Sequence, residues 1–282
     1  MKKLIILLLA LLGILIGCSH EEILEYNMFY RYENNEYIDI NFYKNGSEEN
    51  ANDILCLIDY WNTMLDHEHV NDTKNNLAAL NVNKYATLDA KLVELIEYTI
   101  DLSTSYKVVN PLYGTLKDLW DLHMITEELP TENECLTQIE VSLSTRVAIN
   151  DNDVHLLGDG LIDLDYIKKG FIGEKIKEYL ISKGIDRYVI NYNADLVLYG
   201  KNKNGGSFET SFYGMKNGTY NLSDITLARV TADNNCFYTK DGRRWADIPS
   251  FVTGVPNDTF ETLFVLGDDA LKNSILAYAY YS

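Results

Sequence analysis

The sequence predicts an α+β fold in which mixed sheets and packed helices form two closely associated lobes. Residues 36–43 alternate apolar and polar side chains, which is typical of a strand with one buried face. Residues 52–65 and 90–106 carry apolar side chains at helical spacing. Strand and helix patterns follow one another without the regular βα alternation that a doubly wound parallel sheet requires.

Each element expected further along the chain has a local signal. The sequence Asn110-Pro111-Leu112-Tyr113-Gly114 has the composition of a turn. Trp120 lies among leucines and is expected to anchor a core. The later patterns predict short strands near residues 141–149 and 154–156, a buried strand over 188–199, a turn at 200–206 and a C-terminal helix from about Asp269.

The segment from Leu161 to Phe171 is expected to be a strand, a turn and the start of a helix that opens through Lys169-Gly170 and ends near Gly184. A lysine and free N–H groups at a helix N-terminus suit a phosphate. The alternative is an ordinary connection with a solvated lysine, which this segment taken alone favours. Asp163 and Asp165 could hold a divalent cation together, but alternation along a strand would separate their side chains.

The N-terminus indicates export. Lys2 and Lys3 precede an apolar run from Leu4 to Ile16, which is too short to span a bilayer comfortably. Leu15-Ile16-Gly17-Cys18 resembles a bacterial lipobox, so we expect a signal peptide over 1–17, a lipidated Cys18, a tether over 18–27 and a domain over 28–282. The protein would then sit on a membrane surface outside the cytoplasm, on the inner or the outer membrane. A simple signal peptide or an uncleaved anchor are the alternatives.

Composition limits the partners. Without Lys2 and Lys3 the chain has 24 − 2 = 22 basic residues against 42 acidic ones, a net charge of −20, so nucleic acid is excluded as a partner. Cys56, Cys135 and Cys236 are too widely spaced for a zinc ribbon; we expect free thiols rather than one disulfide. His67 and His69 are two residues apart and would face different sides of a helix, so we expect a solvated loop there rather than a metal pair.

Several short motifs occur in a fixed order. Residues 75–81 are similar to S-x-(L/I)-x-x-(L/F)-N, and residues 107–120 to G-(A/L)-F-D-P-x-x-G-x-L-x-x-L-W. Residues 163–171 resemble D-L-G-G-I-A-K-G-Y, residues 191–195 resemble N-x-G-G-D, and residues 241–254 resemble D-G-x-x-x-H-H-I-I-D-P-x-T-G. From about residue 28 to its end, the chain therefore resembles the FAD:protein FMN transferases of ApbE type, many of which are exported lipoproteins.

The resemblance implies FAD as substrate and Mg²⁺ as cofactor. In that family the metal polarises the FAD diphosphate while a threonine hydroxyl of a client flavoprotein attacks, which gives FMN-threonine and AMP. The motif positions imply a magnesium contact from the backbone carbonyl of Tyr166 and a place for Lys169 near the diphosphate. They imply six FAD-binding residues: Val108, Val109, Asn110, Asp163, Lys169 and Ile248.

The chain also departs from the family pattern. Asp165-Tyr166 and Asn193-Ala194 stand where the family has paired glycines, and Asp247 stands at a family histidine that would be catalytic. Ser274 and Tyr278 occupy the positions of the metal-binding aspartate and threonine in the preferred register, and an alternative register places Asp258 and Thr262 there. Two alternatives stay open: a flavin-binding or interaction lipoprotein that has lost catalysis, and a diphosphatase that cleaves FAD with water.

Overall fold

The computed structural model describes residues 26–33, 35–105, 109–212, 218–231, 236–246, 248–256 and 260–281. It confirms the α+β prediction. A six-stranded sheet has the order β1-β2-β6-β7-β10-β13, and every neighbouring pair is antiparallel. Its strands are β1 (Tyr26–Arg31), β2 (Tyr37–Lys44), β6 (Arg187–Tyr192), β7 (Leu196–Tyr199), β10 (Ile225–Thr231) and β13 (Thr262–Gly267).

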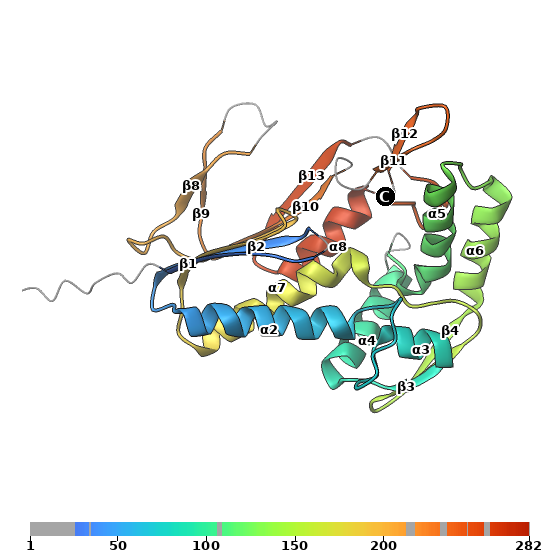
Figure 1. Cartoon of the computed structure of the whole chain (residues 1–282), viewed down its shortest axis with the longest axis horizontal. Coiled ribbons are helices and arrows are strands. Elements are labelled where there is room, and N and C mark those ends of the chain that lie inside the picture. Colours follow the sequence, from blue (N-terminus) through green and yellow to red (C-terminus); the bar gives the residue numbers. More distant parts are fainter. Residues whose placement is uncertain are drawn as a thin grey trace, which may run out of the picture.

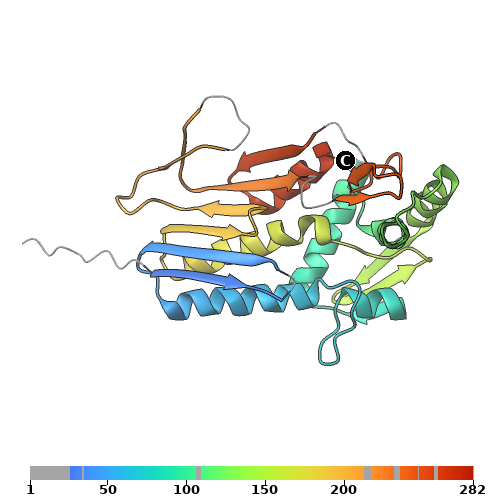
Figure 2. The ribbon, with the colours of Figure 1, turned by 45° about the horizontal axis from the view of Figure 1, so that its top comes forward.

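Three long helices lie against this sheet (Figures 1 and 2). They are α2 (Glu48–Met64), α7 (Asp165–Ser182) and α8 (Ala270–Tyr281). A capping box between Ser47 and Asn50 starts α2, and Gly184, with φ +66°, follows the end of α7. The buried apolar side chains of these helices and of β2 belong to one hydrophobic cluster, which is the main core.

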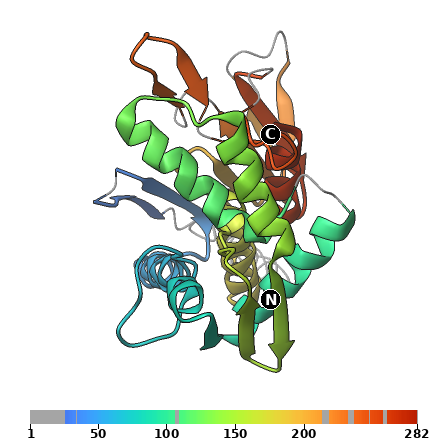
Figure 3. The same ribbon diagram turned by 90° about the vertical axis from the view of Figure 1, so that its right-hand side faces the viewer.

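A second region packs beside the main sheet. Its three-stranded sheet has the order β3-β5-β4, and its helices α5 and α6 lie side by side (Figure 3). The elements are α3 (Leu77–Asn83), β3 (Tyr85–Thr87), α4 (Ala90–Ser105), η1 (Pro111–Tyr113), α5 (Gly114–Thr126), α6 (Glu132–Ser144), β4 (Arg146–Asn150) and β5 (Asp153–Leu157). Trp120 is 1% exposed in a separate cluster with Tyr113, Leu116 and Phe237, so the expected core anchor is confirmed.

Two short hairpins complete the described structure. One pairs β8 (Phe208–Thr210) with β9 (Tyr220–Leu222), and the other pairs β11 (Cys236–Tyr238) with β12 (Arg244–Ala246). Cys56, Cys135 and Cys236 are free thiols, as expected. In the described part of the chain no helix is long and apolar enough to cross a membrane.

Three elements differ from the sequence-based predictions. The strand expected over 141–149 begins only at Arg146, because α6 continues to Ser144. The expected strand at Leu161 is a connection without regular secondary structure, and α7 starts at Asp165, where the Asp163 carboxylate accepts the backbone N–H of Asp165 (2.7 Å). Residues 188–199 form a hairpin of β6 and β7 rather than one strand, because the Asn191 side chain accepts the N–H of Ala194 (2.8 Å) and stabilises a turn.

That turn predicts a stabilising substitution. Asn193 and Ala194 adopt φ values of 54° and 56°, a left-handed conformation that costs a β-carbon residue roughly 1–2 kcal/mol. We expect Ala194→Gly to raise the free energy of unfolding by about 1 kcal/mol, after the larger entropy of glycine in the unfolded chain is subtracted. Urea unfolding followed by circular dichroism measures this. Asn193→Gly is the matched control and should gain less, because asparagine tolerates this conformation; an equal or larger gain there would contradict the explanation.

Candidate functional site

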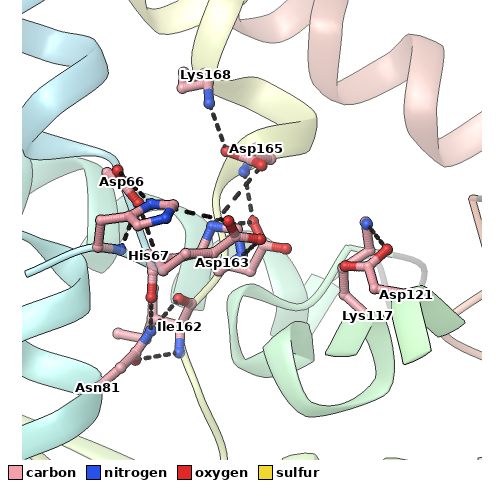
Figure 4. A network of polar contacts seen from close by, with 11 residues as sticks. Asp66, His67, Asn81, Lys117, Asp121, Ile162, Asp163, Asp165 and Lys168 are labelled. Carbon is pink, nitrogen blue, oxygen red and sulfur yellow. Dashed lines mark hydrogen bonds and ion pairs between the residues drawn. The ribbon is translucent and has the colours of Figure 1, made fainter. Parts of the chain in front are cut away.

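Segments that are distant in sequence meet where α7 begins (Figure 4). The Asn81 side chain donates to the carbonyl of Ile162 (2.9 Å) and accepts its N–H (2.8 Å). The N–H of Asp163 donates to the carbonyl of Pro111 (2.9 Å). The backbone is therefore held on both sides immediately before α7, next to Asp163 and Asp165.

His67 completes a cluster with these two carboxylates. Its Nδ1 lies 3.8 Å from Asp163 Oδ1 and 3.8 Å from Asp165 Oδ2, and one ligand atom of each residue lies within 4.8 Å of the others. Both distances are too long for hydrogen bonds. Alternation does not separate the carboxylates, because Asp163 lies in a connection and Asp165 in the first turn of a helix.

The prediction of a solvated loop at residues 67–69 was wrong for His67 and correct for His69. The His67 side chain is 7% exposed, whereas that of His69 is 80% exposed. The difference arises because the loop folds back on buried Asn76, whose side chain donates to the carbonyls of His69 (2.8 Å) and Thr63 (3.2 Å). Sequence reasoning missed His67 because this burial depends on residues outside the motif.

The two carboxylates differ in their electrostatics. Burial, followed by the charge of Asp165, raises the pKa of Asp163 to about 6. Burial also acts to raise the pKa of Asp165, but the Lys168 ammonium, 2.8 Å from Asp165 Oδ1, and the nearby His67 outweigh it and lower that pKa. The arrangement thus holds one readily ionised carboxylate beside one that resists ionisation.

Lys169 lies in the second turn of α7 and not at its N-terminus, so it forms no helix-terminal anion site. The favoured alternative of a solvated lysine was also wrong, because its side chain is 22% exposed and ion-paired. Its Nζ lies 2.7 Å from an oxygen of Asp195 and 2.8 Å from one of Glu36. Arg229 contacts the other oxygen of Asp195 at 3.3 Å. The lysine is therefore already neutralised by two carboxylates, which weakens its attraction for a diphosphate.

Tyr166, Ser274 and Tyr278 do come together, as their motif positions imply. They line a small polar cavity of about 80 Å³ with Asp165, Lys169, Asp195 and Arg229. Tyr166 and Tyr278 meet edge to face, with ring centroids 5.7 Å apart. Close packing of α7 on α8 keeps Ser274 in place: a β-carbon on Gly170 would lie 2.4 Å from Ser274 Oγ, so glycine is required there.

The donors offered by these three residues do not fit a magnesium ion. Mg²⁺ binds through carboxylates, phosphates and water in octahedral geometry. A backbone carbonyl, a serine hydroxyl and a tyrosine phenol supply no negative charge, and the Asp195 carboxylate in the same cavity is engaged by Lys169 and Arg229. The remaining carboxylate of this cavity is Asp165, one oxygen of which is paired with Lys168, so Tyr166, Ser274 and Tyr278 do not by themselves form a magnesium site.

A larger apolar pocket of about 420 Å³ lies between the second region and the loop after β12. Asn110, Tyr113 and Phe251 line it, whereas Val109 is fully buried and Ile248 packs against the main core. The Phe251 ring contacts Tyr113 (centroids 3.7 Å apart) and Tyr166 (6.1 Å). These aromatic contacts connect the apolar pocket with the polar cavity.

Val108, Asp247, Asp258 and Cys18 lie outside the described residues.

Comparison with known proteins adds three structural relatives. The sequence model of the ApbE family matches residues 37–281. The ApbE protein of Thermotoga maritima has a TM-score of 0.75 and 16% identity, over 92% of this chain and 86% of that one. The flavinyl transferase ApbE of Pseudomonas stutzeri gives 0.74 and 12%, over 91% and 84%, and the flavin transferase ApbE from Vibrio cholerae gives 0.70 and 16%, over 91% and 86%. No curated protein matches the sequence.

Proposed function

Because the chain belongs to the ApbE family, we propose that it transfers FMN from FAD to a threonine of a client flavoprotein. One observation carries this proposal. Asn110, which lies at a flavin position of one motif, lines the apolar pocket, and Phe251 connects that pocket to Tyr166 in the motif at the start of α7. A flavin ring and a diphosphate need this combination of neighbouring apolar and polar spaces.

The apolar pocket suits the isoalloxazine ring. Tyr113 and Phe251 offer aromatic faces to a flat ring, and most of the lining is hydrophobic. The diphosphate would then extend towards Asp165, Tyr166 and Lys169. Because Lys169 is paired with Glu36 and Asp195, FAD binding would require it to exchange one of these partners for a phosphate oxygen.

The proposed reaction breaks the diphosphate bond of FAD. The threonine hydroxyl oxygen of the client attacks the phosphorus of the FMN half, an oxygen–phosphorus bond forms, and AMP leaves with the bridging oxygen. The hydroxyl proton passes to a base, for which we propose Asp247 from its motif position. The charge that accumulates on the phosphate oxygens needs cations, which Lys169 and a divalent metal would supply.

A second candidate function is flavin binding without catalysis. It is favoured by the neutral donors of Tyr166, Ser274 and Tyr278 and by the two carboxylates that occupy Lys169. In this case FAD would bind in the apolar pocket and remain intact. The two candidates share the pocket and differ only in turnover.

We further propose that a lipid on Cys18 anchors the protein to the outer face of a membrane and places it beside exported clients. The lipobox-like sequence before Cys18 supports this location. Mass spectrometry of the protein from a lipoprotein-processing bacterial host is the test. The expected mature chain begins at an acylated Cys18, and an unmodified Cys18 would contradict the anchor.

An assay with FAD separates the functions. The full chain in detergent is incubated with FAD, a divalent metal and a client protein that carries an acceptor threonine. The expected result is a client that gains the mass of FMN minus water, with release of one AMP per modified client. A client with the acceptor threonine replaced by alanine is the control and should stay unmodified. FAD that binds and stays intact would support the second candidate, and free FMN formed without any client would indicate a diphosphatase.

A further inference from the structure

The position of the buried His67 imidazole is not explained by hydrogen bonds among the described residues. Its side chain is more than nine-tenths buried, and its Nε2 has no hydrogen-bond partner in the described part of the chain. Glu68 Oε1 lies 3.8 Å from Nε2, which is also too long for a hydrogen bond. The other nitrogen, Nδ1, is directed at the Asp163 and Asp165 carboxylates but stays beyond hydrogen-bond distance (Figure 4).

The ligand atoms of the three residues lie within 4.8 Å of one another, which approaches the spacing of ligands around one ion. Nitrogen and oxygen ligands bound at about 2.1 Å from a shared metal lie roughly 3–4 Å apart from each other. Nδ1 lies 3.8 Å from one oxygen of each carboxylate. Metal binding would therefore need shifts of less than about 1 Å, within the reach of small side-chain rotations.

Neighbouring groups orient the ligand atoms. Lys168 donates to Asp165 Oδ1 (2.8 Å) and leaves Oδ2 facing His67. The N–H of Asp165 donates to Asp163 Oδ1 (2.7 Å), and Asn81 fixes the backbone one residue before Asp163. Hydrogen bonds of this kind hold the ligands of established metal sites in their binding orientation.

From these observations we propose that His67, Asp163 and Asp165 bind a divalent transition-metal ion of the Mn²⁺, Fe²⁺ or Zn²⁺ class in preference to Mg²⁺. One imidazole and two carboxylates are a donor set that such ions accept, whereas Mg²⁺ favours oxygen donors only. Asp165 also lines the polar cavity that contains Tyr166. The ion would therefore lie beside Tyr166 and supply the positive charge of the cation that Tyr166, Ser274 and Tyr278 do not bind. Only this role beside a diphosphate rests on the proposed function; metal binding itself does not.

Mn²⁺ binding to the full chain in detergent, without FAD or client, tests the site. After treatment with a chelator, the protein is titrated with Mn²⁺ and followed by electron paramagnetic resonance. We expect one bound Mn²⁺ per chain, a nitrogen modulation from the imidazole in the pulsed spectrum, and no displacement by a tenfold excess of Mg²⁺. His67→Gln and Asp165→Asn should each weaken binding at least tenfold, and His67→Gln should remove the nitrogen signal.

His69→Gln is the matched control, because His69 is a neighbouring histidine with an exposed side chain. It should bind Mn²⁺ as the unmodified protein does. Four results would each overturn the proposal: no Mn²⁺ binding, bound Mn²⁺ without a nitrogen signal, displacement of Mn²⁺ by Mg²⁺, or Mn²⁺ binding that is lost in Ser274→Ala but kept in His67→Gln. The nitrogen signal of the unmodified protein decides the question even if the variants fail to fold. A protein that binds Mn²⁺ through His67 but transfers no FMN would retain this site and refute the proposed function.

Discussion

Replacement of Trp120 by alanine is expected to lower the free energy of unfolding by about 4 kcal/mol, because a fully buried indole leaves a large cavity. Trp120 packs with Tyr113, Leu116 and Phe237. Its Nε1 also donates to the carbonyl of Gly254 (2.8 Å), which the substitution leaves without this partner. The loss combines a cavity with a broken buried hydrogen bond, two of the largest single-site effects known in proteins.

Urea unfolding of the full chain in detergent measures this loss. It is followed by far-ultraviolet circular dichroism, which reports on the backbone rather than on the tryptophan that is removed. Leu122→Ala is the matched control, because Leu122 lies two residues further along α5 and its side chain is 58% exposed. The control should change stability by about 0.5 kcal/mol or less. Similar losses in both variants would contradict the role of Trp120 as the anchor of this region.

The same anchor bears on flavin binding. Gly254 belongs to the same loop as Phe251, which lines the apolar pocket. The hydrogen bond from Trp120 to Gly254 therefore stabilises this loop, although Trp120 does not line the pocket. Trp120→Phe keeps most of the packing and removes only the N–H donor. If the proposed flavin pocket is correct, this variant weakens FAD affinity more than Leu122→Ala does, although neither side chain lines the pocket.

The fold was predictable where local patterns decide it. The strand around Ile38 and Ile40, the helix from Ala90 and the C-terminal helix near Asp269 follow from the periodicity of their own residues. The hairpin at Asn193 and Ala194 was missed, because a non-glycine turn with two left-handed residues resembles a continuous strand in sequence. There the contact of Asn191 with the backbone of Ala194 outweighs the β propensity of the apolar run.

The site was predictable only in part. Motif order located Asp163, Lys169 and Tyr166 near the start of one helix, and Asn110 in a pocket. The partners of these residues come from elsewhere in the chain: Glu36 and Asp195 neutralise Lys169, and His67 faces Asp163. Such contacts depend on tertiary packing, which no spacing rule in the sequence describes.

The pKa of Asp163 leads to the second large effect. Burial and the charge of Asp165 raise the pKa of this carboxyl from 3.8 to about 6 in the folded protein. The unfolded chain therefore releases this proton at lower pH than the folded protein does. As pH rises from about 4 to about 6, the folded state loses stability relative to the unfolded state, and the full deficit of about 3 kcal/mol persists above pH 6.

Asp163→Asn is accordingly expected to raise the free energy of unfolding at pH 7.5 by about 3 kcal/mol in the presence of a chelator. The asparagine stays neutral, and its side-chain oxygen can still accept the N–H of Asp165, the first residue of α7. The gain should shrink to below about 1 kcal/mol at pH 4, because the aspartate is then protonated in the folded protein and partly protonated in the unfolded chain. Unfolding measured at pH 4, 6 and 7.5 checks this, with Asp101→Asn on the exposed side of α4 as a control that stays within about 0.5 kcal/mol. An unstable Asp163→Asn at pH 7.5 would contradict the raised pKa.

A carboxylate that destabilises the fold at neutral pH is typical of a site shaped for binding rather than for stability. Addition of Mn²⁺ shows whether Asp163 binds a metal or is only a destabilising buried carboxylate. A metal at 100 times its dissociation constant stabilises the folded protein by about 2.7 kcal/mol. If His67, Asp163 and Asp165 hold that metal, it should stabilise the unmodified protein at pH 7.5 and nearly remove the advantage of Asp163→Asn, which binds it weakly. If Mn²⁺ stabilises both proteins equally, Asp163 is a buried carboxylate without a role in binding the ion.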